Sequence, residues 1–537
     1  MDQDYDVVII GSGIGGLATA VAAAEFGMSA IVLEKHAKLG GGTAASHGGF
    51  WVAGNHLARA EGIEDSRENA LAYMRFIGGD ELDEARMLTF IDRSPEALEF
   101  YDRCGVRFLF VKGHGDHYYD GAPGSVGSGR MLEVELISAN DLGDWKDAVA
   151  VWSQAPLEMT VTEKRKWGGV NDPHNWDNEL LERRRRDRLR GRGVGVVTHF
   201  LKQALRRDVT VRPAAPVDRL ALDDERVIGV VMQDGATVRA REGVVIASGA
   251  YESNPEMVAN YEGLPGFLSM YPPTITGDGI TMAMEIGAAC RTIHNNLGIF
   301  LGFHLPSDEP GEPPSFRLAT IAEILCPHTI VVNRAGRRIG DESFFPSMVP
   351  TLRQFVTATH DYANLPCYLI FDSQFKERLS FADRPPGSPI PEWVSRGSSV
   401  GELAGKLGID AQGLDGTISR FNEFAATGID ADFHRGERRW SVGAPKSHGS
   451  NPSLGSLAVA PFYGLRLHPS AFASAGLLAN SAAQVIHQRH HPICGLYAVG
   501  NAAAHNEYGV GYQAGHSLTS GMTFGYLAAL HMRDGQK

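Results

Sequence analysis

The start of the chain alternates apolar runs and glycine-rich turns in an order that predicts a strand, a helix and a second strand. Residues 5–10 are mostly β-branched and apolar, as in a buried parallel strand. After a glycine cluster, the alanine-rich run 17–26 predicts a helix that stops at Gly27. The apolar run 29–33 predicts the second strand, which leads directly into Glu34. This order is typical of a nucleotide-binding βαβ unit.

Apolar runs further along the chain predict strands that return to this first domain. They cover residues 209–217, 227–232 and 236–247, and the last leads into small residues that let a ligand approach the backbone. A short strand within 495–499 ends in the same way. A helix is expected to begin behind Asp278.

The segment 280–446 differs in character, because it is rich in proline and mixes short elements of several kinds. A chain of 537 residues is also long for a single hydrophobic core. We therefore predict an α/β protein with two domains. A Rossmann-like nucleotide-binding domain, discontinuous over 1–279 and 447–537, would carry an inserted α+β substrate or capping domain at 280–446.

Charge and cysteine content narrow the class of protein. The net charge of −13 argues against nucleic acid as a partner, because phosphate repels an acidic surface. Five cysteines are scattered without a CxxC pair, which argues against a local metal or redox motif and against a disulfide framework. The acidic first residues lead directly into a strand rather than a signal peptide, and no apolar run reaches the ~20 residues of a membrane helix. We expect a soluble, cytoplasmic protein.

The glycine cluster GSGIGG has the spacing of a dinucleotide-binding fingerprint. Gly11 would make the tight turn, Gly13 would let the backbone approach a pyrophosphate, and Gly16 would allow close packing of helix on sheet. The helix N-terminus would supply partial positive charge, and Glu34 would accept a ribose hydroxyl.

A second glycine-rich loop follows Glu34 closely, in KHAKLGGGTAASHGGFW. A nicotinamide cofactor does not need this loop, whereas the longer FAD does, so we predict one bound flavin. The glycines at 191–195 follow no apolar strand and are interpreted as a loop rather than as a second nucleotide site.

Motifs spread along nearly the whole chain carry a family resemblance. They are GSGIGG, GGTAASHGGFWVAGN, VVIASGAYESNPEM, TGDGITMA, VNRAGRRIGDES, PFYGLRLHPSAF, GLYAVGN and MTFGYLAA. The chain resembles the fumarate reductase/succinate dehydrogenase flavoprotein superfamily and, within it, is most like the 3-oxosteroid (3-ketosteroid) dehydrogenases of steroid metabolism. The steroid-type likeness depends mainly on residues 129–145, on PFYGLRLHP and on MTFGY.

The resemblance implies noncovalent FAD, because His47 directly precedes a glycine pair, whereas the flavin-linked histidine of succinate dehydrogenases lies several residues earlier. It also implies that the N-terminus of a helix opening at His516 faces the flavin. The FAD-binding residues that follow from these motifs are Gly11, Gly13, Ile14, Gly15, Gly16, Glu34, Lys35, Gly42, Thr43, Ala44, Ser46, Gly48, Gly49, Val217, Ala247, Gly249, Asp278, Gly500, Asn501, Ser517 and Leu518.

The reaction that the resemblance implies is the introduction of a C=C bond next to a ketone, as in 3-oxosteroid 1- or 4-dehydrogenases. It needs an acid at the ketone oxygen, a base for the α-proton, and flavin N5 for the hydride. A neutral phenol suits the first role. In the resembled steroid enzymes a tyrosine and a glycine four residues later hold the ketone. Gly515 matches that glycine, but Gly511 stands at the tyrosine position, so Tyr512 or Tyr508 would have to supply the hydroxyl.

A second departure concerns the base. The resembled enzymes have an arginine or a tyrosine shortly after the Asp-Glu pair, where this chain has Phe344, Phe345 and Pro346. The base is left unassigned, and the candidates are Tyr118, Tyr119, His304, His468 and His516. The arginine that holds a dicarboxylate in fumarate reductases is also missing from the loop near Tyr512, which predicts a hydrophobic, uncharged ketone as substrate. Guanidinium groups lining the cavity would contradict this prediction.

Other interpretations stay open at this point. The same chemistry could run backwards in an ene reductase acting on an enone, and FAD could be purely structural. A diffusible acceptor would take the electrons. The histidines of HQRHHP (487–492) are expected in a surface turn and not at a metal site. Seven arginines within 181–193 could contact anionic lipid at a membrane surface, but a solvated charged face is favoured.

Overall fold

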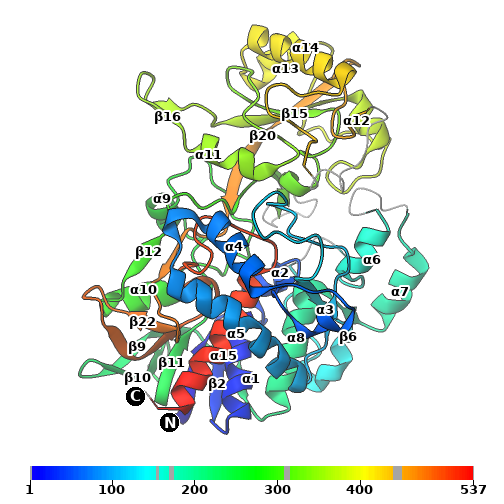
Figure 1. Ribbon diagram of the computed structural model, residues 1–537. Coiled ribbons are helices and arrows are strands. Elements are labelled where there is room, and N and C mark those ends of the chain that lie inside the picture. Colours follow the sequence, from blue (N-terminus) through cyan, green and yellow to red (C-terminus); the bar gives the residue numbers. More distant parts are fainter. Residues whose placement is uncertain (1–2, 153–155, 169–174, 307–314, 439–449, 536–537) are drawn as a thin grey trace.

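A computed structural model describes residues 3–152, 156–168, 175–306, 315–438 and 450–535 (Figure 1). Figure 1 shows a larger lower part, which contains both chain ends, and a smaller upper part that carries α13 and α14. Across the described residues, no helix is both long enough and apolar enough to cross a membrane.

The lower part is built on an eight-stranded sheet. Its main path runs β22-β23-β11-β1-β2-β8, with β10 paired to β11 and β9 paired to β10. The pairs β23–β11, β11–β1, β1–β2 and β2–β8 are parallel, as expected for a Rossmann-like unit. The strands are β1 (Gln3–Ile10), β2 (Ala30–Leu33), β8 (Thr210–Arg212), β9 (Val217–Asp223), β10 (Arg226–Met232), β11 (Thr237–Ile246), β22 (Gln484–Ile486) and β23 (Pro492–Ala498). The predicted strands of this domain are present, except that the run 209–217 forms a strand only over 210–212 and Val217 begins β9.

Strand β1 is buried on both faces. Val7 and Ile9 belong to the cluster that packs under the helices, while Val8 and Ile10 belong to a cluster on the opposite face. This alternation follows from the two-residue period of a strand, and it explains why the run is apolar throughout.

Helices cover the sheet and meet one another closely. Helix α1 (Ile14–Glu25) packs against α15 (His516–Arg533) and α8 (Arg192–Leu205), and α15 packs on α5 (Glu84–Arg103). A Cβ placed on Gly525 of α15 would lie 2.9 Å from the carbonyl oxygen of Gly15, so a glycine there lets α15 approach α1.

The glycines at 191–195 do not form the predicted loop. They begin α8, with Gly191 at the N-cap. A Cβ on Gly193 would lie 1.9 Å from the carbonyl oxygen of Thr43, so these glycines permit close packing of α8 on α2 (Gly41–Ala45). Glycine is needed both where two helices pack closely and where a loop must be flexible. The sequence pattern alone does not distinguish these two cases.

The upper part contains a six-stranded antiparallel sheet in the order β14-β13-β20-β18-β15, with β19 also paired to β20. Helices α13 and α14 share a hydrophobic cluster with one face of this sheet. The elements are β13 (Ile299–Leu305), β14 (Ser315–Leu318), β15 (Thr329–Asn333), β18 (Cys367–Asp372), β19 (Ser395–Gly397), β20 (Phe462–Ala471), α13 (Val400–Leu407) and α14 (Ala411–Thr427).

Strand β20 differs from the predicted division of the chain. It lies beyond residue 447 but pairs with β13 and β18, so it belongs to the inserted sheet. The chain enters the upper part after β12 (Cys290–Thr292) and returns to the lower part before β21 (Ala475–Leu477). These two strands pair with each other. Composition indicates that an apolar strand exists but not which sheet it joins. We therefore propose domain boundaries within 293–298 and 472–474.

The remaining elements are short connections and peripheral helices. They are β3 (Phe50–Trp51), β4 (Phe108–Phe110), β5 (Met131–Val134), β6 (Ile137–Ser138), β7 (Leu189–Arg190), β16 (Phe355–Val356), β17 (Asp361–Tyr362), α3 (His56–Ala60), α4 (Arg67–Gly78), α6 (Val161–Lys166), α7 (Asn178–Arg186), α9 (Pro255–Tyr261), α10 (Asp278–Glu285), α11 (Val349–Leu352) and α12 (Ser373–Arg378). The helix predicted behind Asp278 is α10. Of these elements, α6 and α10 contribute residues to the wall of the site, as does α2.

Candidate active site

One cavity of about 1230 Å³ connects the glycine fingerprint to the inserted sheet. The N-terminus of α1, the loop after β2 and the N-terminus of α15 form its wall in the lower part. Phe300 of β13 and Leu318 of β14 contribute from the upper part. A cavity shared by two domains is a common position for a ligand site.

The fingerprint glycines occupy the positions that the sequence predicted. Gly11 has φ +105°, and a Cβ there would lie 2.5 Å from the carbonyl oxygen of Ala247. A Cβ on Gly16 would lie 2.0 Å from the carbonyl oxygen of Gly11, which confirms a packing role for Gly16. Gly13 is the N-cap of α1. The N–H of Ile14 donates to the hydroxyl of Thr43 at 2.9 Å, and Gly13, Ile14 and Gly15 line the cavity, so the positive end of the helix borders it.

Glu34 lies at the end of β2 with its carboxylate buried against the fingerprint. Its Oε2 accepts hydrogen bonds from the N–H of Ser12 at 3.1 Å and from the Ser12 hydroxyl at 2.6 Å. Its Oε1 accepts from the N–H of His36 at 3.0 Å. This carboxylate lines the cavity, as needed for a group that accepts a ribose hydroxyl.

Nearly all the predicted FAD-binding residues line this cavity. Gly16 and Ala44 do not, because Gly16 packs against the turn and Ala44 is fully buried within α2. Those that line it are Gly11, Gly13, Ile14, Gly15, Glu34, Lys35, Gly42, Thr43, Ser46, Gly48, Gly49, Val217, Ala247, Gly249, Asp278, Gly500, Asn501, Ser517 and Leu518.

The N-terminus of α15 forms a second helix end at the cavity. Gly515 is the N-cap with φ +96° and no side-chain cap, and Ser517 and Leu518 follow it in the wall. An uncapped helix end stabilises negative charge placed before it. The N-terminal ends of α1 and α15, with the carboxylate of Glu34, are a donor and acceptor set that fits FAD: a pyrophosphate at α1, a ribose at Glu34 and a flavin ring before α15.

Beyond the predicted flavin region, the cavity becomes an aromatic chamber. The ring of Tyr512 lies 4.5 Å from Phe472, 5.8 Å from Tyr118 and 6.1 Å from Phe300, measured between centroids. Tyr271 lines the same cavity, a phenol that the sequence did not single out. Burial raises the pKa of both Tyr118 and Tyr512, so their hydroxyl groups stay neutral and can donate hydrogen bonds.

The loop that carries Tyr118 is fixed by a buried carboxylate. Asp116 accepts hydrogen bonds from the indole N–H of Trp51 and from the guanidinium of Arg130, both at 2.7 Å, and from the N–H of Val126 at 3.0 Å. The side chain of Gln513 joins this loop to the one carrying Tyr512, because its Oε1 accepts from the N–H of Tyr118 at 3.4 Å. The two phenols are therefore held by connected loops.

Tyr119 does not line the cavity, unlike its neighbour Tyr118. Its ring packs edge-on against Phe344 at 6.1 Å, and its buried hydroxyl has no hydrogen-bond partner among the described residues. Phe344 and Pro346 are buried at the position where the resembled enzymes carry their catalytic residue. Among the described side chains, the segment Phe344 to Pro346 therefore presents no charged or phenolic group to the site. The side chain of Phe345 is not among those that the structure describes.

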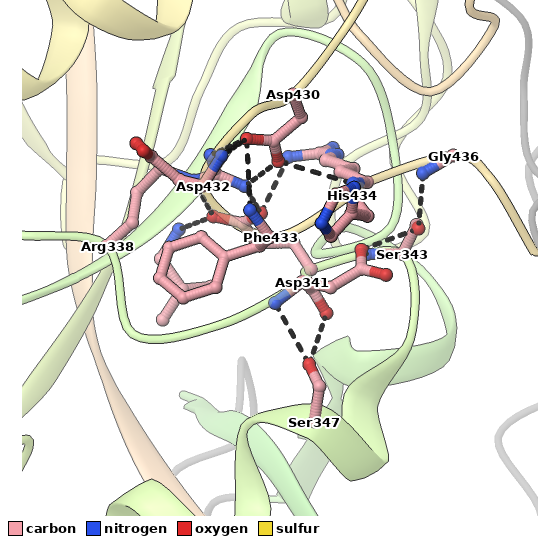
Figure 2. Close-up of polar contacts among 12 residues, drawn as sticks. Arg338, Asp341, Ser343, Ser347, Asp430, Asp432, Phe433, His434 and Gly436 are labelled. Atoms are coloured by element: carbon pink, nitrogen blue, oxygen red, sulfur yellow. Dashed lines mark hydrogen bonds and ion pairs between the residues drawn. The ribbon is translucent and has the colours of Figure 1, made fainter.

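A polar network holds the segment around Phe344 (Figure 2). Arg338 donates bidentate hydrogen bonds to Glu342 (2.9 and 2.6 Å) and to Asp430 (3.1 and 2.8 Å). The hydroxyl of Ser347 accepts from the N–H of Asp341 at 2.9 Å. The Asp-Glu pair of this motif therefore fixes the backbone, and it does not line the cavity.

The remaining candidates also lie outside the cavity wall. Tyr508 packs between His505 and His516, with ring centroids at 4.9 and 5.0 Å. His468 lies in β20, where its Nδ1 is 3.0 Å from the carbonyl oxygen of Gly266 and its ring stacks on His304 at 6.2 Å. His516 is buried against Trp51 at 4.8 Å. The structure thus brings Tyr118, Tyr512 and Gly515 of the predicted catalytic residues to the cavity and leaves Tyr119, Tyr508 and His468 outside it.

Glu252 lines the cavity although the sequence gave no reason to select it. Its side chain is 3% exposed; Oε1 accepts from the N–H of Ala473 at 3.2 Å, while Oε2 is buried without a partner among the described residues. Burial raises its pKa to about 7. A carboxyl with such a pKa can accept and release a proton near neutral pH.

We expect the Glu252→Gln variant to gain stability over the parent as the pH rises. The folded parent holds a proton that the unfolded chain releases near pH 4.5, so its stability is greatest below pH 4.5 and falls as the pH rises through about 7. A neutral amide escapes this loss, which amounts to roughly 3 kcal/mol for the shift of the pKa to about 7. Urea unfolding at pH 5 and pH 8 measures the difference. The same comparison for Glu256→Gln, an exposed residue of α9, should show no such change.

Positive side chains also line the cavity. Lys164 and Arg165, both from α6, contribute to the wall together with His47, His114 and His117. The sequence predicts an uncharged ketone as substrate from arginines missing at two family positions, and the guanidinium of Arg165 in the wall is an observation against the uncharged part of that prediction. The EKRK run of α6 resembles a solvated charged helix face, so its contribution to the cavity could not be recognised in the sequence.

The cavity fits FAD, and a comparison with known protein families also identifies an FAD-binding protein. Residues 6–518 match the model of the FAD binding domain family. The chain is 36% identical to 4-oxocyclohexanecarboxylate 2-dehydrogenase of Sinomonas cyclohexanicum, over 98% of this chain and 92% of that protein. It is 31% identical to 3-oxosteroid 1-dehydrogenase of Mycolicibacterium smegmatis, over 98% and 97%. Its fold is similar to that of a 3-ketosteroid delta1-dehydrogenase from Sterolibacterium denitrificans in complex with 1,4-androstadiene-3,17-dione, with a TM-score of 0.86, 28% identity, and coverage of 99% and 100%.

Proposed function

The chain belongs to the FAD binding domain family, and from this membership we propose that it is an FAD-dependent dehydrogenase that introduces a C=C bond next to the ketone of a ring substrate. A ring ketone is common to the names of the two relatives, 4-oxocyclohexanecarboxylate 2-dehydrogenase and 3-oxosteroid 1-dehydrogenase. FAD, when bound, supplies the hydride acceptor for the β-carbon.

One observation carries the proposal: the cavity that begins at the dinucleotide fingerprint continues without interruption into a chamber containing Tyr118 and Tyr512. A substrate in this chamber lies beside any flavin placed before α15. A structural FAD would not need an aromatic chamber with two phenols at its side.

The proposed roles follow from chemistry and placement. Tyr512 donates a hydrogen bond to the ketone oxygen, next to the N-cap residue Gly515, and so stabilises the charge that develops on that oxygen. Tyr118, whose ring centroid lies 5.8 Å from that of Tyr512, orients the substrate ring. Because burial keeps both phenols neutral, a separate base is needed, and we assign the α-proton to Glu252, whose Oε2 lacks a hydrogen bond from the described residues.

Anaerobic titration of the flavin tests the proposal. We expect 4-oxocyclohexanecarboxylate, or a saturated 3-oxosteroid, to bleach the flavin absorbance near 450 nm (about the usual position for oxidised flavin). An ene reductase would instead show rapid reoxidation of pre-reduced enzyme by the enone and no bleaching by the saturated ketone. Turnover without any change of flavin colour would contradict both and favour a structural FAD. The diffusible electron acceptor and the cytoplasmic location stay predictions from the sequence.

A further inference from the structure

One end of the aromatic chamber is positively charged. Lys164 and Arg165 reach it from α6, and the loop that carries Tyr118 supplies His114 and His117. The Arg165 guanidinium hydrogen-bonds the ring of His114 and, at 3.2 Å, the carbonyl oxygen of Gly113. The α6 cations therefore adjoin the same loop that positions a phenol of the proposed ketone site.

The distance between this end and the phenols is short. The ring of His117 lies 4.4 Å from Tyr118 and 4.5 Å from His114, so Tyr118 and His114 are at most about 9 Å apart between centroids. A small ring molecule could thus contact the phenols with one substituent and the cationic end with another.

Negative partners for this charge are missing from the described part of the chain. Two carboxylates of the loop that carries Tyr118, those of Asp116 and Asp120, line the cavity; Asp116 is bound to Arg130 at 2.7 Å, and no ion pair joins a described carboxylate to Lys164 or Arg165. The histidines do not supply the charge, because burial lowers the pKa of His114 to about 2 and that of His117 to about 4. Burial and the positive charges of Arg192 and Arg317 lower the pKa of Lys164 to about 7. A lysine ammonium group that is shielded from water and lies near other positive charges is stabilised by a bound anion.

We propose that Lys164, supported by Arg165, binds a carboxylate of the substrate, so that the enzyme prefers a ring ketone bearing a carboxylate to a neutral steroid. This inference rests on the proposed function, because it identifies the class of substrate for the same chamber. The Nε2 atom of His114 supports it independently, since it is buried without a hydrogen-bond partner among the described residues. Lys164 also acts electrostatically on His47, which precedes the predicted FAD-binding residues Gly48 and Gly49, so the test must separate a contact to the substrate from a contact to the flavin.

The test compares an acid with its ester on a lysine variant. The probes are 4-oxocyclohexanecarboxylate and its methyl ester, which share the ring and the ketone and differ in charge. For Lys164→Met we expect kcat/KM on the acid to fall about 10- to 100-fold, the usual value of a charge-assisted hydrogen bond, while the ester changes less than about threefold. Lys164→Arg should keep most of the preference for the acid over the methyl ester. Lys166→Met, an exposed position on the same helix, is the matched control and should behave as the parent.

A binding measurement keeps the inference separate from the proposed reaction. Cyclohexanecarboxylate has no ketone and cannot be oxidised by this route, and its dissociation constant can be measured by calorimetry on the flavin-containing protein. Lys164→Met should weaken its binding about 10- to 100-fold even if no ketone is ever oxidised. Equal losses on acid and ester would show that Lys164 acts on the flavin or the fold, and an unchanged binding constant for cyclohexanecarboxylate would refute the carboxylate site.

Discussion

Replacing Gly11 by alanine is expected to yield a protein that purifies without flavin. Gly11 has φ +105°, and an added Cβ would lie 2.5 Å from the carbonyl oxygen and 2.8 Å from the carbonyl carbon of Ala247. Neither backbone can move away easily, because Ile10 and Ile246, which precede these two residues, are paired in the central sheet. The turn must therefore change shape, and it is this turn that presents the N-terminus of α1 to a pyrophosphate.

The ratio of flavin absorbance to protein absorbance after gel filtration measures this effect. Gly27→Ala is a matched control, because Gly27 also has a positive φ of +83° but has no atom within 4 Å of its Cβ position. It should lose on the order of 1 kcal/mol of stability and keep its FAD. Full FAD content in Gly11→Ala would mean that the turn can relax and that the fingerprint does not act through its close contacts.

The nucleotide-binding half of the molecule could be predicted because its signals are local. Gly11 and Gly13 follow the first strand, and one helix and one strand separate them from Glu34; the hydrophobic periods of all three elements are visible in a single stretch of sequence. The family resemblance then extended the prediction to segments far along the chain, such as Ser517 and Leu518 at the start of α15, and most of those residues do line the cavity.

The substrate half depends on which way single side chains point, and that is decided by tertiary packing. Tyr118 and Tyr119 are neighbours in an irregular loop, yet one faces the chamber and the other packs on Phe344. No periodicity applies to such a loop, so the sequence could not separate them. Glu252 and Lys164 were missed for a related reason. An acid after a strand and a charged helical run are usually solvated, and only the fold shows that they border a cavity.

Tyr512→Phe is expected to lower kcat about 100- to 1000-fold while the enzyme keeps its FAD and its fold. The phenylalanine ring preserves the 4.5 Å contact with Phe472, so the change removes a single hydroxyl. Because that hydroxyl meets a negative charge that develops only during the reaction, KM should change little. The rate of anaerobic flavin bleaching by the saturated ketone measures the step directly.

Two further phenylalanine variants make the result specific. Tyr119→Phe and Tyr508→Phe remove hydroxyls that lie close to the chamber but outside its wall, so both should retain activity within a few-fold of the parent. If Tyr512→Phe were fully active and Tyr118→Phe inactive, the ketone would be held by Tyr118 instead, and the ring carbon that meets the flavin would change with it. The position of the new double bond therefore depends on whether Tyr118 or Tyr512, whose ring centroids lie 5.8 Å apart, binds the ketone oxygen.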